Sequence, residues 1–166
     1  MLSWLKGLPE ESIKKLCRDV FHDSLVNTIR PEILATLEKH RKQNGAVVLL
    51  SSASSPICEP VSKHLGLDDL ICTHLSSDNG ILNGTTDGKL VYGMEKKHRL
   101  LSYCKAHGFD PNDAFYYGDS YTDHHVMEAV GNPVAVSPDR RLLKIATRRN
   151  WPVIAQNSRL PQLHLN

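Results

Sequence analysis

The residues best suited to chemistry lie in one hexapeptide, GDSYTD at 118–123. Its two carboxylates, Asp119 and Asp123, are four positions apart, so one at the end of a strand and one in the first turn of a helix can point toward the same place. Carboxylates, together with water and phosphate oxygens, are the ligands that Mg²⁺ prefers. Alternatively, Asp119 is a turn residue and Asp123 an acid that favours a helix start. The hexapeptide therefore predicts either a metal site or an ordinary strand–helix junction.

Three further residues could bind an anion. Ser51 and Ser52 follow an apolar run and precede a helix signal, where hydroxyl and backbone N–H groups often hold phosphate. They could instead cap that helix. Lys96 lies near the start of a predicted helix, where a cation is electrostatically unfavourable. Its ammonium group either reaches for an anion or is a solvated surface charge.

These residues can act together only if the fold brings the ends of different strands close to one another. Along the chain, apolar runs alternate with helix signals. The alternation predicts an α/β fold with a parallel, doubly wound sheet and flanking helices. In such sheets, chemistry takes place at the carboxyl ends of the strands. The predicted strands are 46–50, 70–75, 114–117, 133–136 and 152–155, and the predicted helices are 9–21, 31–44, 56–65, 95–107, 121–130 and 142–149.

Composition narrows the function classes. The chain has 166 residues, 40% of them hydrophobic and 23% charged, as expected for one globular domain or for two if one is small. A net charge of +2 argues against nucleic acid or an acidic membrane as a partner. Four scattered cysteines without a CxxC pair are typical of reduced thiols and predict a cytoplasmic protein. No apolar run approaches the roughly 18 residues of a membrane span.

Taken in order, the motifs resemble one family. An apolar strand that ends in Ser, then LGL, a turn-rich hairpin, a Lys before a helix and a final YGDSxxD…VGxPVAVxPD pattern are similar to the haloacid dehalogenase superfamily. Within it, the phosphoserine-phosphatase-like branch with a helical cap is the nearest in pattern. The resemblance runs from about Gly7 to Pro152, and the residues that carry it are 47–54, 65–67, 78–80 with Gly84, Lys96, 116–123 and 130–139.

The resemblance implies a Mg²⁺-dependent phosphomonoester hydrolase that acts through an aspartyl-phosphate on a small phosphorylated metabolite. By resemblance, Ser51 would hydrogen-bond the phosphoryl oxygens, with Ser52 as the alternative if the alignment shifts by one residue. Lys96 would neutralise phosphate charge. Asp119 would bind Mg²⁺, and Asp123 would be a second ligand or a support.

One motif of the family is absent. The pattern DxDx[TV], which carries the nucleophile and the general acid/base, does not occur, because no two Asp residues lie two positions apart. No apolar strand precedes residue 46 either. We therefore expect an N-terminally truncated chain that lacks the central strand of its sheet, is inactive alone and can self-associate through that incomplete sheet. Its expected parts are a cap remnant at 1–30, the α/β core at 31–156 and a tail at 157–166.

Two other functions fit parts of the pattern. A non-catalytic phosphate- or protein-binding pseudo-phosphatase would keep Asp119 and Lys96 for structure alone. A serine esterase would use Ser120 of the GDS motif as nucleophile. Such esterases place GDS near the N-terminus and a DxxH motif near the C-terminus, whereas the DxxH of this chain, 19–22, precedes its GDS. The order argues against an esterase.

Overall fold

The computed structural model describes residues 2–154, apart from the side chain of Glu32. The chain divides into two compact units, residues 1–91 and 92–166. The residues predicted to be a cap remnant, as far as they are described, belong to the first unit, and their assignment to a cap stays a prediction. The tail predicted at 157–166 lies outside the described residues.

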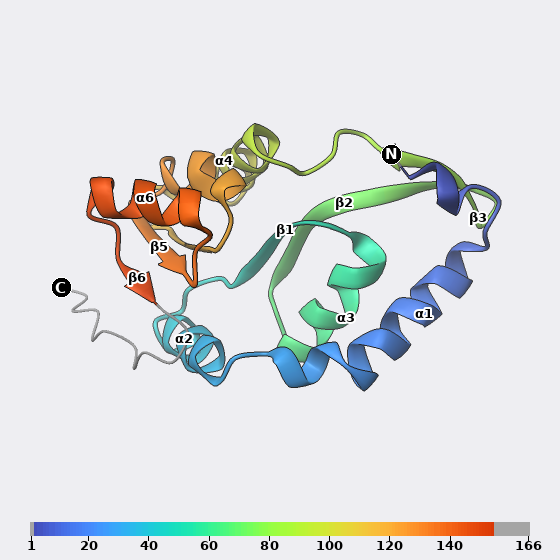
Figure 1. Cartoon of the computed structure of the whole chain (residues 1–166), viewed down its shortest axis with the longest axis horizontal. Helices are drawn as coiled ribbons and strands as arrows, with labels where there is room; N and C mark the ends of the chain where they lie inside the picture. Colours follow the sequence, from blue (N-terminus) through green and yellow to red (C-terminus); the bar gives the residue numbers. More distant parts are fainter. Residues whose placement is uncertain (1, 155–166) are drawn as a thin grey trace. The chain divides into compact units, whose positions relative to one another are not determined.

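A three-stranded sheet forms the centre of the first unit (Figure 1). Strand β1 (Val48–Ser54) pairs in parallel with β2 (Asp69–Asp78), and β2 pairs antiparallel with β3 (Ile81–Asp87), in the order β1-β2-β3. Asn79 and Gly80 join β2 and β3 with φ angles of 51° and 77°. Two consecutive positive φ angles characterise the tight turn that suits a two-residue hairpin, and Asn-Gly is its preferred sequence.

Helices cover one side of this sheet. Helix α3 (Ser55–Leu65) connects β1 to β2 and packs on both, and α1 (Glu10–Asp23) packs on α3 (Figure 1). Phe21 of α1 is 1% exposed, and its ring meets that of His64 edge-on with centroids 5.3 Å apart. The unit also contains the 3₁₀ turns η1 (Ser3–Leu5) and η2 (Leu25–Thr28) and helix α2 (Pro31–Lys42).

The second unit is built on a parallel sheet. Its order is β4 (Phe115–Gly118), β5 (Asn132–Val136) and β6 (Val153–Ile154). Helix α4 (Met94–His107) precedes β4, the 3₁₀ turn η3 (Tyr121–Asp123) and α5 (His124–Met127) follow it, and α6 (Arg140–Arg149) follows β5. The core is apolar: Val126, Val134, Ala135, Leu142 and Ala146 are at most 2% exposed.

The predicted α/β fold with parallel strands and flanking helices is confirmed. The prediction of one parallel sheet was too simple, because the described residues form two three-stranded sheets and the Asn79-Gly80 turn makes β2 and β3 antiparallel. The helix predicted at 121–130 is a 3₁₀ turn followed by the four-residue α5. Within residues 2–154, no helix combines the length and apolar character needed to cross a membrane.

Candidate functional site

The carboxyl end of β4 carries the two predicted carboxylates. Gly118 is the last residue of β4, and a Cβ atom there would lie 3.1 Å from Cβ and 3.2 Å from Oδ2 of Asp123. Glycine at 118 therefore lets Asp123 pack directly against the strand end. Asp123 is 3% exposed, whereas Asp119, the first residue after the strand, is exposed. The strand end thus presents one buried and one accessible carboxylate.

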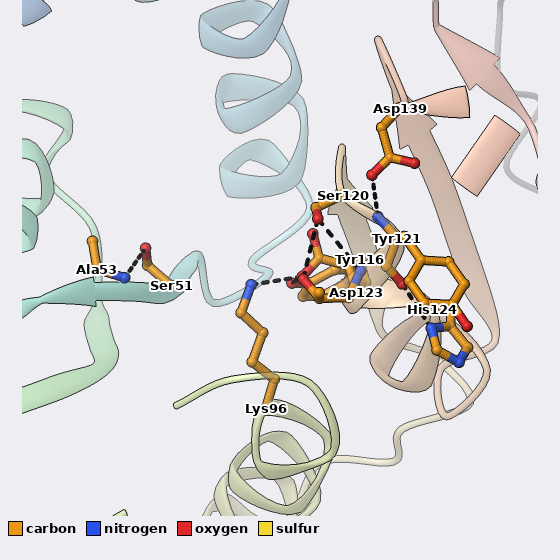
Figure 2. Close-up of polar contacts among 10 residues, drawn as sticks. Ser51, Ala53, Lys96, Tyr116, Ser120, Tyr121, Asp123, His124 and Asp139 are labelled. Carbon is orange, nitrogen blue, oxygen red and sulfur yellow. Dashed lines mark hydrogen bonds and ion pairs between the residues drawn. The ribbon is translucent and has the colours of Figure 1, made fainter. Parts of the chain in front are cut away.

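The buried carboxylate is paired with a buried lysine (Figure 2). Nζ of Lys96 lies 2.6 Å from Oδ1 of Asp123, and Lys96 is only 6% exposed. The Tyr116 hydroxyl donates a hydrogen bond of 3.2 Å to the same Oδ1. Burial and the negative charge of Asp123 raise the pKa of the Tyr116 phenol, so it stays protonated as a donor. Lys96 is therefore held by an ion pair and is not a solvated surface lysine.

The position of Lys96 follows from the start of α4. Gly93 precedes the helix with φ 53° and ψ −121°, a backbone conformation that side-chain-bearing residues rarely adopt. The chain turns sharply there, and Lys96 falls in the first turn of α4 with its side chain directed at Asp123 (Figure 2). A cation at a helix N-terminus is unfavourable by itself. The negative charge of Asp123 offsets the unfavourable interaction of the Lys96 ammonium with the N-terminus of α4.

Ser51 and Ser52 lie inside β1, so the prediction that the strand ends at residue 50 was wrong. The ladder between β1 and β2 shifts register between Leu50 and Ser54. The Ser51 hydroxyl accepts a hydrogen bond of 3.2 Å from the Ala53 N–H, which is a local turn-like bond within this irregular stretch. Ser52 is exposed. Both serines belong to the first unit, whereas Lys96, Asp119 and Asp123 belong to the second.

The hydroxyl of Ser120 is engaged locally. Its Oγ lies 3.1 Å from Oγ1 of Thr122 and accepts a bond of 3.4 Å from the Thr122 N–H. This is the pattern of a residue that caps a turn. His124, the nearest imidazole in sequence, has Nδ1 2.6 Å from the Tyr121 carbonyl oxygen. Within residues 2–154 no hydrogen bond connects the Ser120 hydroxyl to a histidine, so the esterase alternative gains no support.

The oxygen donors at the end of β4 are few. Among residues 2–154 no three His, Cys, Asp or Glu side chains are grouped as a metal site. The Asp119 carboxylate accepts no hydrogen bond from the described residues, whereas Oδ1 of Asp123 already accepts two. Mg²⁺ commonly keeps several waters and takes one or two carboxylates plus phosphate oxygens. The exposed Asp119 carboxylate could therefore hold such an ion together with phosphate, with Asp123 as a support.

Two contributors to this site were missed in the sequence. Tyr116 is two residues before Gly118 on the same face of β4, and period-two spacing in the strand was the signal for its contact with Asp123. Asp139 contacts the loop after β4 from the start of α6. Its position just before a helix signalled a cap, but nothing local indicated which loop it would reach.

The α/β fold thus carries an accessible carboxylate and a lysine–carboxylate pair at the end of a parallel strand. The chain belongs to the haloacid dehalogenase-like hydrolase family, whose model matches residues 1–128. The predicted family is therefore confirmed.

Individual relatives agree with this assignment. The chain is 29% identical over 150 residues to a Streptomyces azureus protein named for inhibition of morphological differentiation, covering 90% of this chain and 54% of the relative. It is 24% identical over 152 residues to a phosphoserine phosphatase of Mycobacterium tuberculosis, covering 92% and 49%. The chain thus spans about half the length of these curated relatives.

A solved structure shows the same fold. A phosphoserine phosphatase in its apo form superposes with a TM-score of 0.72 at 21% identity, covering 95% of this chain and 73% of the other. Similarity to the phosphoserine-phosphatase-like branch is therefore confirmed for both sequence and fold.

Proposed function

We propose that this chain supplies the lysine and metal-binding part of a phosphomonoester hydrolase whose substrates are small phosphorylated metabolites. One observation carries the proposal: the buried Lys96–Asp123 pair lies in the same unit as the exposed Asp119, which directly follows β4. Burying a lysine costs desolvation free energy, so a buried lysine often has a function. Here the lysine could attract an anion such as phosphate, and the accessible carboxylate could bind a cation that contacts the same anion. A similar protein named phosphoserine phosphatase supports the substrate class.

Each residue has a distinct part in this proposal. The ammonium of Lys96 neutralises phosphate charge, and Asp123 with Tyr116 fixes its direction. Asp119 binds Mg²⁺, which when present screens the repulsion between phosphate and an anionic nucleophile. That Ser51, with Ser52 as the alternative, donates a hydrogen bond to a phosphoryl oxygen stays a prediction from the family resemblance. Removing one such preorganised contact typically lowers the rate by about 10²–10³-fold.

The missing nucleophile motif limits the reaction that the chain can carry out alone. An aspartyl-phosphate mechanism needs the DxDx[TV] pair, and residues 1–166 contain no two Asp residues two apart. We therefore propose that these residues bind phosphate in the presence of Mg²⁺ but do not turn over a phosphomonoester by themselves. N-terminal truncation remains a prediction, which reading the DNA upstream of the Met1 codon for an in-frame or frameshifted DxDxT segment tests.

The experiment is a titration with inorganic phosphate in millimolar Mg²⁺, followed by NMR, beside an assay with an aryl phosphate. We expect phosphate binding that is weakened at least about tenfold in Asp119→Asn and in Lys96→Met. Lys97→Met is the matched control, because it removes the same charge one residue away. Equal binding by wild type and both site variants would contradict the proposal. Hydrolysis that needs Asp119 would show that another carboxylate acts as nucleophile.

A non-catalytic phosphate- or protein-binding pseudo-phosphatase is the second candidate. The missing DxDx[TV] pair is the observation that favours it. Phosphate binding without hydrolysis fits both candidates, so the upstream DNA distinguishes them. A reading frame without any DxDxT segment would support the pseudo-phosphatase.

The remaining expectations concern partners and place. Self-association through the incomplete sheet is proposed for β1, which within residues 2–154 pairs only with β2. A cytoplasmic location and the lack of nucleic-acid or membrane partners stay predictions from charge and cysteine content.

A further inference from the structure

The loop that carries Asp119 is tied to the start of α6 by two hydrogen bonds that converge on one residue. Oδ2 of Asp139 accepts a bond of 2.6 Å from the Tyr121 N–H (Figure 2). The N–H of Asp139 donates a bond of 2.8 Å to the Asp119 carbonyl oxygen. Asp139 thus contacts the first and third residues of the loop, one with its backbone and the other with its side chain.

The same carboxylate also caps α6, with its other oxygen. Oδ1 of Asp139 accepts bonds from the N–H groups of Arg141, at 2.9 Å, and Leu142, at 2.8 Å. A helix N-cap needs only one acceptor oxygen, which is why Ser serves as well as Asp in this position. The second oxygen of Asp139 is therefore not explained by capping. It is used entirely on the loop.

Two neighbouring features also restrain the contact between the 119–121 loop and the start of α6. The guanidinium carbon of Arg141 lies 3.6 Å from the centroid of the Tyr121 ring, within the range of a cation–π contact. Ser137, between β5 and Asp139, has a φ of 42°, which is uncommon for a residue other than glycine. Such a conformation persists where surrounding contacts fix it. The start of α6 is thus held against the loop by backbone, side-chain and ring contacts.

We propose that Asp139 is a positioning residue for Asp119, which it serves by clamping the 119–121 loop to α6 with its N–H and Oδ2. This inference rests on the proposed function, in which Asp119 is the metal ligand. The exposed Asp119 carboxylate has no hydrogen-bond partner of its own within residues 2–154, so its direction depends on its backbone. A displacement of about 1 Å in such a group can cost about 10²-fold in catalysis.

Substitutions at 139 separate the clamp from the cap. Asp139→Ser keeps an acceptor for the helix but leaves none for Tyr121, and Asp139→Asn keeps the shape but turns one acceptor into a donor. Asp139→Ala, which removes both, is the control for loss of the cap. Amide hydrogen exchange and ¹⁵N relaxation at residues 119–121 report on the loop, and those at 143–149 report on α6. The phosphate titration in Mg²⁺ is repeated on each variant.

In Asp139→Ser we expect exchange at the Tyr121 N–H to rise at least about tenfold, as loss of one hydrogen bond predicts. Order parameters at 119–121 should fall from about 0.85 toward 0.6, while those of α6 stay unchanged. Phosphate affinity should fall about three- to tenfold with the helix intact. A loop as rigid as in wild type, or a loosened loop with unchanged phosphate affinity, would overturn the inference.

A measurement on the wild-type chain guards against variants that fail to fold. Scalar couplings across hydrogen bonds should connect the Tyr121 nitrogen with the Asp139 carboxyl carbon, and the Asp139 nitrogen with the Asp119 carbonyl carbon. Their absence overturns the clamp. If both couplings are present but the wild-type chain binds no phosphate, the proposed function fails and the clamp stands.

Discussion

At the scale of single residues, the Lys96–Asp123 pair is the feature of the second unit whose substitution should change its stability most. Lys96 and Asp123 are 6% and 3% exposed, so each is the buried ion-pair partner of the other. Desolvating two charges costs several kcal/mol each, which their attraction and the Tyr116 hydrogen bond offset. A pair of this kind adds little net stability over apolar residues of similar size, and its value lies in holding Lys96 in one direction.

This gives a stability prediction. Asp123→Ala leaves the Lys96 ammonium buried without its partner and should destabilise the fold by about 3–5 kcal/mol. The double variant Lys96→Met/Asp123→Leu removes both charges and should recover most of that loss. Urea unfolding of the two variants and the wild type measures the difference. A double variant as unstable as Asp123→Ala would mean that the pair itself stabilises the unit.

At the scale of elements, the first residues of the chain are attached to the hairpin. The N–H of Gly7 donates to the Leu82 carbonyl oxygen at 2.8 Å, and the N–H of Glu10 donates to that of Gly80 at 2.8 Å. The Ser77 hydroxyl donates a bond of 2.6 Å to Oε2 of Glu10, and Nζ of Lys14 lies 2.7 Å from Oε1 of the same carboxylate. Glu10 therefore links the start of α1 to β2.

Stability should accordingly depend on pH through Glu10. Hydrogen bonds from Lys14 and then Ser77 hold the pKa of Glu10 below its ordinary value of 4.5. Its contribution is present above 4.5, the value expected in the unfolded chain, and is lost as pH falls through the lower folded value. We expect Glu10→Gln to be less stable than wild type at pH 7, by under about 1 kcal/mol, and equal to it in strong acid.

The control for this prediction is Glu11→Gln. Glu11 contacts the same lysine at 3.4 Å, but its side chain is 77% exposed and makes no hydrogen bond to β2. Urea midpoints measured from pH 7 down to pH 3 compare the three chains. If the two glutamine variants follow the same curve, the link to Ser77 contributes nothing.

Element types could be predicted from the sequence better than element ends. The turn-rich hairpin at 78–80 and the helix ends at 65 and 107 are found as predicted, because Asn79-Gly80, Gly66 and Gly108 are local signals for turns and helix ends. The end of β1 was predicted wrongly because Ser, unlike Gly or Pro, does not by itself terminate a strand. The helix predicted at 142–149 starts two residues after α6 does, because the apolar pattern begins at Leu142 whereas the helix begins next to its cap, Asp139.

The candidate site was also predictable only in part, because only some of its residues are marked by local sequence signals. Lys96, Asp119 and Asp123 are recognisable from residue type and motif order, and the structure brings Lys96 and Asp123 into contact. Tyr116 and Asp139 act across 7 and 18 positions of sequence. The Tyr116 contact has a local signal in the period-two spacing of β4, whereas the Asp139 contact follows from the register of β4 against β5, with Gly118 opposite Ala135, and no local pattern encodes it.

At the scale of the whole molecule, the edge strand β1 of the first sheet is unusually apolar for a strand at an edge. Strand β1 contributes Val48, Leu49 and Leu50, an apolar run typical of strands covered on both faces, yet all three are only half-buried. Edge strands are usually protected by lysine, proline or a bulge that twists the edge away. β1 has neither lysine nor proline, although its register with β2 is irregular.

We therefore predict that the chain alone associates through β1 or unfolds at modest temperature. Sedimentation velocity should show a species that grows with concentration, and Ser52→Lys, which places a charge on the exposed part of β1, should shift it toward monomer. Gln43→Lys adds the same charge at an exposed position outside β1 and is the control. A clean monomer with one cooperative thermal transition well above about 50 °C would contradict the prediction, because an unpaired apolar edge would then cost too little to matter.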